Sequence, residues 1–159
     1  MVQAHAVPDQ KSEPGFLTKF LCKVAWKPFN MPKQPIAMPD TNHSIEYGKY
    51  LAHNLDCFSC HSADFKSNNY LNPEKSPGYF GGGNKTLNKK GEIVLTSNLT
   101  PDNDYGIGKW SEEDFIKALK YGVKKEGGSF KYPMMPYPYL SDYEAAAIYQ
   151  YLQTIPALK

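Results

Sequence analysis

The sequence contains no run of about 18 consecutive apolar residues, the length that a membrane-spanning helix requires. Its first residues also lack the apolar stretch of a secretory signal peptide. The sequence also lacks a large excess of either charge, because 18 basic and 16 acidic residues give a formal net charge of only +2. This balance argues against nucleic acid as the main partner. The 159 residues suit one domain with an extra arm.

Cysteine is scarce as well, with three residues in the chain. An odd number is a poor framework for disulfide bonds. We expect Cys22, which lies far from the other two, to be a buried small hydrophobe rather than a reactive thiol. Cys57 and Cys60 are only three residues apart, and this spacing makes them the first candidates for a functional site.

Proline divides the chain into an N-terminal extension, residues 1–40, and a compact domain, residues 41–159. Four prolines between positions 28 and 39 exclude a helix there and favour an extended arm. Before them, residues 14–27 are predicted to form a short helix. Its apolar face would carry Phe16, Leu17, Phe20, Leu21 and Val24.

Helix start and stop signals define the secondary structure of the domain. Ser111 with Asp114, and Ser141 with Glu144, have the spacing of capping boxes, and Gly122 is a typical helix terminator. The predicted helices cover residues 44–55, 112–121 and 142–154.

Two further features of the domain involve glycine. Gly48 lies inside the first of these helices, where it costs about 1 kcal/mol relative to alanine, and such a glycine often marks the close approach of another backbone. Residues 87–95 are predicted to form a small hairpin that turns at Lys90 and Gly91. In the first helix, Ile45, Tyr50, Leu51 and Leu55 are the candidate buried positions.

The segment Cys57-Phe58-Ser59-Cys60-His61 has the Cys-x-x-Cys-His spacing of a covalent haem attachment site. Two thiols on one helical turn can reach the two vinyl groups of a porphyrin. The next residue, His61, can then place its imidazole under the ring and ligate the iron.

Two other readings of the paired cysteines remain open at this point. A zinc site would need two further ligands, but the remaining Cys22, His5, His43 and His53 are scattered. A thioredoxin-like redox pair would need a preceding buried strand, whereas a helix is predicted there.

A sixth iron ligand would have to come from far along the chain, and a methionine thioether is a common choice in electron-transfer cytochromes. Met134 and Met135 are adjacent, and Pro133 and Pro136 flank the pair. A loop stiffened in this way loses little entropy when it binds. The alternative is that the two methionines only fill the core.

Several motifs in order resemble class I cytochromes c over residues 44–155, and above all the haem domains that serve bacterial alcohol and sugar-acid dehydrogenases and related small periplasmic cytochromes. In chain order they are Gly48-Lys49-Tyr50-Leu51, Cys57 to His61, Asn98-Leu99-Thr100-Pro101-Asp102, Gly106-Ile107-Gly108-Lys109-Trp110-Ser111, Pro133-Met134-Met135-Pro136-Tyr137, Leu140 to Glu144, and Ile148 to Leu152.

The resemblance implies an all-α cytochrome c fold, with three to five helices around one haem, a small β-hairpin insertion and the extended N-terminal arm. It implies that the first and last helices cross near Gly48. By position, Met135 is the axial ligand and Met134 the variable residue. Trp110 either faces the haem or packs the core. Asn98 and Tyr137 are further candidate haem-binding residues.

The expected function is electron transfer by one haem c that is attached through Cys57 and Cys60 and ligated by His61 and Met135. The chain would be an electron carrier and not an enzyme, working between a donor dehydrogenase or membrane complex and an acceptor oxidase. Because haem attachment takes place in an exported compartment, we expect a periplasmic protein whose targeting segment or membrane anchor has been removed. The alternatives are a haem enzyme or gas sensor with an open sixth iron position, and a haem-free zinc module.

Overall fold

The computed structural model describes residues 11–26 and 35–159, and the chain divides into two units, residues 1–35 and 36–159. In the first unit, α1 (Phe16–Val24) forms inside the predicted helical segment, and none of its residues is buried. The expectation of a buried Cys22 is wrong, because its side chain is exposed. Of the predicted extended arm, residues 28–34 lie outside the described residues, and residues 35–39 have no regular structure.

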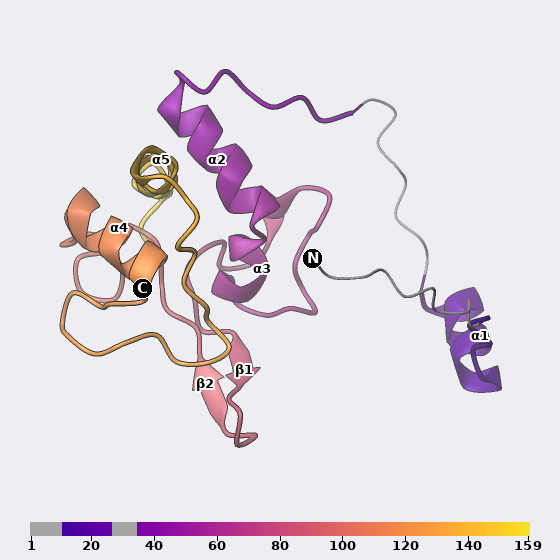
Figure 1. The fold of residues 1–159 in the computed structure, drawn as a ribbon. Helices are drawn as coiled ribbons and strands as arrows, with labels where there is room; N and C mark the ends of the chain where they lie inside the picture. Colours follow the sequence, from indigo (N-terminus) through magenta and orange to yellow (C-terminus); the bar gives the residue numbers. More distant parts are fainter. Residues whose placement is uncertain (1–10, 27–34) are drawn as a thin grey trace, which may run out of the picture. The chain divides into compact units, whose positions relative to one another are not determined.

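The second unit is mostly helical, with one small antiparallel sheet, and its helices lie close together in Figure 1. Helix α5 packs against both α2 and α4, and α3 follows α2 directly. This architecture confirms the predicted fold class. The elements in chain order are α2 (Ser44–Asn54), α3 (Cys57–His61), the 3-10 helix η1 (Pro73–Lys75), β1 (Lys85–Leu87), β2 (Ile93–Leu95), α4 (Glu112–Tyr121) and α5 (Asp142–Leu152).

Both C-terminal helices begin at the predicted capping boxes. The Ser111 and Ser141 hydroxyls each accept a hydrogen bond from the backbone N–H three residues later, and the Asp114 and Glu144 carboxylates accept from the serine N–H groups. Two of the otherwise unpaired donors at each helix start are satisfied in this way. Helix α4 ends at Gly122, which adopts the left-handed conformation with φ +72°.

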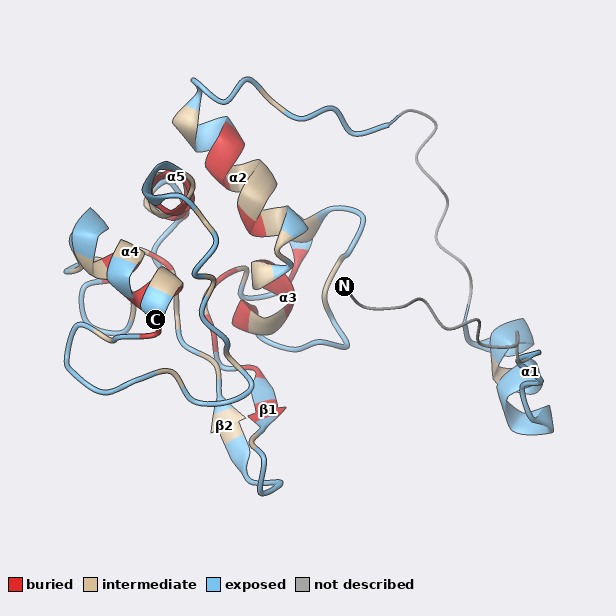
Figure 2. Ribbon diagram, in the orientation of Figure 1, coloured by how far each residue is buried: buried red, intermediate tan, exposed pale blue. Residues whose placement is uncertain are grey.

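Helices α2 and α5 cross at Gly48. A Cβ atom added there would lie 1.9 Å from the Ala147 carbonyl oxygen, so only glycine allows this approach. The buried face of α2 is Tyr47, Gly48 and Ala52, and it is coloured red in Figure 2. Ile45, one of the predicted buried positions, is instead 46% exposed.

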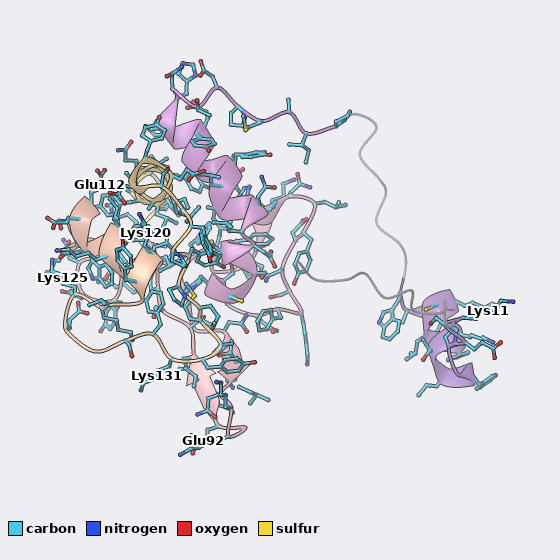
Figure 3. All side chains as sticks on the ribbon, in the orientation of Figure 1. Lys11, Glu92, Glu112, Lys120, Lys125 and Lys131 are labelled. Carbon is cyan, nitrogen blue, oxygen red and sulfur yellow. The ribbon has the colours of Figure 1, made fainter. Side chains whose placement is uncertain are left out.

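The core lies between α2, α4 and α5 and continues under the loops that precede the hairpin. Strands β1 and β2 pair with Thr86 opposite Val94, and Gly91 in the turn has φ +78°, as the predicted turn requires. Glu92 marks the tip of the hairpin in Figure 3. The buried core residues are Ala52, Phe58, Phe80, Ile107, Phe115, Leu119, Ala145, Ile148, Tyr151, Leu152 and Ile155.

Candidate haem site

A cavity of about 570 Å³ opens beside α3, and every candidate haem-binding residue lines it. Its volume lies in the range of about 300–1,000 Å³ that is usual for ligand and cofactor sites. The hairpin, α4 and α5 contribute apolar side chains to the wall. The candidates that line it are Cys57, Cys60, His61, Asn98, Trp110, Met135 and Tyr137, together with Met134.

Helix α3 presents the two cysteines and the histidine on a single short turn. It follows Asp56, which adopts the left-handed conformation with φ 56° and so turns the chain between α2 and α3. The Ser59 hydroxyl donates a hydrogen bond to the Asp56 carboxylate at 2.7 Å, and the Ser62 hydroxyl donates to the Phe58 carbonyl at 2.6 Å. These bonds fix both ends of the turn.

The ring of His61 is held in one orientation. Its Nδ1 lies 2.8 Å from the carbonyl oxygen of Ser97, an acceptor, so Nδ1 carries the proton and Nε2 is the nitrogen left for a metal. Burial lowers the pKa of His61, which favours the neutral imidazole that metal ligation requires. Gly82 lies beside His61, because the Gly82 N–H donates a hydrogen bond to the His61 carbonyl at 2.7 Å.

The environment of the two cysteines bears on the alternative readings. Burial, reinforced by the neighbouring Asp56 carboxylate, raises the pKa of the Cys57 thiol to about 12. A thioredoxin-like pair needs the opposite shift, toward a reactive thiolate. A structural zinc site usually has four such ligands, and over residues 11–26 and 35–159 no group of three or more His, Cys, Asp or Glu side chains is arranged to hold a metal ion.

The methionine pair lies on the loop between α4 and α5. The Tyr137 N–H donates to the Leu119 carbonyl, and the Phe130 N–H donates to the Gly122 carbonyl, each at 2.8 Å. Both sides of the methionine pair are therefore anchored to α4. Met134 is half-buried against the core, whereas Met135 is 62% exposed, and both line the cavity.

The remaining candidates have different surroundings. Trp110 lines the cavity and also packs against the core, so the structure combines the two readings of this residue. Tyr137 lines the cavity half-buried, and burial raises its pKa. The side chain of Asn98 accepts hydrogen bonds from Thr100 and donates one to the Leu158 carbonyl at 2.6 Å. These bonds fix the loop at that edge of the cavity.

Sequence reasoning missed several residues of the site. Ser97 acts through its backbone carbonyl, which any residue could supply, so no signal in the sequence marks it. The hairpin residues Val94 and Leu95 line the cavity, and so do Leu55 and Phe80. The short distance along the chain between the hairpin and the Asn98 motif was the one available hint.

The residues present fit a covalently attached haem. Haem c needs two thiols, a neutral imidazole and an apolar surround, and the cavity supplies all three. Met135 is among the residues that line the cavity, which is compatible with a ligand position.

Comparison with known proteins leads to the same class. The cytochrome c family model matches residues 45–156, and the chain belongs to this family. Membership confirms the predicted cytochrome c fold and the reading of the chain as an electron carrier rather than an enzyme.

Several relatives are cytochrome subunits of bacterial dehydrogenases. The chain is 38% identical over 110 residues to the cytochrome c subunit of the quinone alcohol dehydrogenase of Gluconobacter oxydans. It is 39% identical over 110 residues to the gluconate 2-dehydrogenase cytochrome c subunit of Pantoea cypripedii. Each match covers 67% of this chain but only 20% and 22% of the relative, so the chain spans about a fifth of these proteins. The fructose dehydrogenase cytochrome subunit of Gluconobacter japonicus is 30% identical over 126 residues, which is 77% of this chain and 24% of that protein.

Proposed function

We propose that this chain carries single electrons through one haem c, attached through Cys57 and Cys60 and ligated by His61 and Met135, between a donor dehydrogenase or membrane complex and an acceptor oxidase in the periplasm. The observation that carries the proposal is the orientation of His61. The Nδ1–H of His61 donates a hydrogen bond to the Ser97 carbonyl, and His61 lines the same cavity as both cysteines.

When bound, the haem supplies an iron that alternates between the ferrous and ferric states. The residues of this chain do the rest. The Ser97 carbonyl fixes the tautomer of His61 and increases the basicity of the ligating nitrogen. The thioether of Met135 favours the ferrous state relative to a second imidazole. The apolar wall excludes water and so lowers the local dielectric constant around the site.

The proposed donor rests on the relatives, which are cytochrome subunits of dehydrogenases that oxidise alcohol, gluconate and fructose. Encounters between electron-transfer partners bury little surface and are short-lived. Met135 lines the cavity and its side chain is 62% exposed, so we assign the electron-transfer contact to the edge that carries this residue.

Two matched variants test the ligation. In matured protein, Met135→Ala is expected to abolish the ferric thioether-to-iron charge-transfer absorption band, whereas Met134→Ala keeps it. Loss of the band in Met134→Ala alone would reassign the ligand to Met134. A native protein without the band would refute methionine ligation and favour an enzyme or gas sensor with an open iron site.

Attachment and partners need separate measurements. Denaturing electrophoresis followed by a haem stain reports covalent attachment, and the Cys57→Ser/Cys60→Ser variant is the control that must lose the stain. Stopped-flow mixing with a reduced alcohol or sugar-acid dehydrogenase tests the donor, with haem reduction as the readout. Cell fractionation tests the periplasmic location, and recovery of the haem protein from the cytoplasmic fraction would contradict it.

A further inference from the structure

Helix α1 is not used by the haem site, and it exposes a continuous apolar face. Phe16, Leu17 and Val24 are 86%, 67% and 58% exposed, and Phe20 is 51% exposed. These residues share one side of the helix, because they recur at spacings of three, four and seven or eight positions. Figure 2 shows α1 exposed along most of its length.

A nine-residue helix of this kind is marginal in water on its own. Burial of an amphipathic face supplies most of the stability of helices in proteins, and the apolar face of α1 is exposed instead. A surface that covers this face would therefore stabilise the helix at the same time as it binds it.

The charges of the segment indicate what that surface is. Lys19 and Lys23 are exposed on the polar side of α1, and the helix has no acidic residue. From position 14 to position 39 the sequence has four lysines and no Asp or Glu. Without these four, the 18 basic residues of the chain become 14 against 16 acidic ones, so the net positive charge of this protein comes from the sequence segment 14–39.

Trp26 adds a third feature. It follows the last turn of α1, and its backbone N–H donates a hydrogen bond to the Leu21 carbonyl at 2.9 Å. Its side chain is 58% exposed. Tryptophan prefers the boundary between lipid headgroups and acyl chains, where its ring is in apolar surroundings and its N–H is hydrated.

We propose that α1 is a membrane-surface helix, which lies in the plane of an anionic phospholipid bilayer with Phe16, Leu17, Phe20 and Val24 in the acyl boundary and its lysines among the headgroups. A helix that is apolar on one face and whose only charged side chains are cationic has the chemistry of such interfacial helices. Among the described residues, no helix is long and apolar enough to cross a bilayer.

Vesicle flotation of the full-length haem protein tests this proposal. A reductant is present so that the exposed Cys22 does not link two chains through a disulfide bond. The protein is expected to float with vesicles of phosphatidylcholine mixed with phosphatidylglycerol. Leu17→Ser/Phe20→Ser should weaken this binding at least tenfold, because two apolar side chains no longer enter the lipid. Leu87→Ser/Ile93→Ser is the matched control: it removes two similarly exposed apolar side chains from the hairpin, and it should float like the native protein.

The charge contribution has its own pair of variants. Lys19→Gln/Lys23→Gln should weaken binding to the anionic vesicles roughly twenty-five-fold, about fivefold for each lysine near the surface. Lys66→Gln/Lys75→Gln, which changes the net charge equally at exposed positions of the domain, should bind as before. Equal binding to pure phosphatidylcholine would contradict the role given to the lysines.

Tryptophan fluorescence tests whether α1 itself contacts the lipid. Trp26 emission is expected to shift to shorter wavelength when anionic vesicles are added, and Trp26→Phe should abolish the shift. The proposal fails if the native protein does not float, or if Leu17→Ser/Phe20→Ser floats as well as its control. It also fails if sedimentation shows that α1 instead pairs two copies of the chain in solution, with the dimer lost in the same variant.

Discussion

Replacing Gly48 by alanine should destabilise the domain by about 2 kcal/mol. The new Cβ would lie 1.9 Å from the Ala147 oxygen and 2.4 Å from the Ala147 carbonyl carbon, and ordinary contact begins near 3.4 Å. Helices α2 and α5 must therefore separate by about 1.5 Å at their crossing. Backbone atoms cannot rotate away as a flexible side chain can, so the overpacking cost lies near the upper end of the usual range, about 3 kcal/mol. The higher helix propensity of alanine offsets about 1 kcal/mol of this cost, which leaves a net destabilisation of about 2 kcal/mol.

Urea unfolding of the haem protein, followed by far-UV circular dichroism, measures this change as a shift of the midpoint at constant slope. Glu46→Ala is the control, since it places alanine on the exposed side of the same helix and should leave stability within about 0.5 kcal/mol. If Gly48→Ala were as stable as the native protein, or more stable by the propensity gain, the close crossing of α2 and α5 would be refuted.

Three further outcomes follow from single sites. Ser141→Ala should lower the free energy of unfolding by about 1 kcal/mol, because the α5 cap is lost, and Ser141→Asp should restore most of it; equal stability of Ser141→Ala would exclude the cap. Gly82→Ala should shift the reduction potential, because Gly82 has φ +72° and a Cβ there would lie 2.5 Å from the Ser97 carbonyl carbon that supports His61; Gly83→Ala, also at positive φ but in open space, controls for backbone strain. Burial lowers the pKa of His53 below 6.5, with the charge of Lys49 as a second cause. Protons therefore bind the unfolded chain first, and the free energy of unfolding should fall as the pH drops below about 6.5. Urea midpoints between about pH 7.5 and 5.5 measure this, and the fall should be shallower in His53→Gln.

The sequence predicted helix boundaries best where local chemistry determines them. Helix α4 begins at its capping box and ends at Gly122 as expected, because the residues that stop it are also the residues that satisfy its end groups. Ile45 shows the limit of this reasoning. Its exposure depends on the direction from which α5 approaches α2, and that direction is set by the tertiary contact at Gly48.

The site shows the same division. Cys57, Cys60 and His61 are recognisable because the chemistry requires those side chains at that spacing, and the structure brings them to one cavity. The support for His61 comes from a backbone carbonyl, which leaves no trace in residue identity. Sequence reasoning also expected Cys22 to be buried, whereas the face of α1 that carries it is exposed, and periodicity alone does not say whether a face meets protein or another medium.

His61 and the methionine loop, which line the same cavity, are held in place by different parts of the fold. His61 is braced by Ser97, next to the hairpin, whereas the methionine loop is tied to α4 at Leu119 and Gly122. With the proposed His61 and Met135 ligation, a substitution in α4 would change the methionine position while His61 keeps its geometry. Such independent supports give evolution, or a protein engineer, two separate adjustments of the same redox centre.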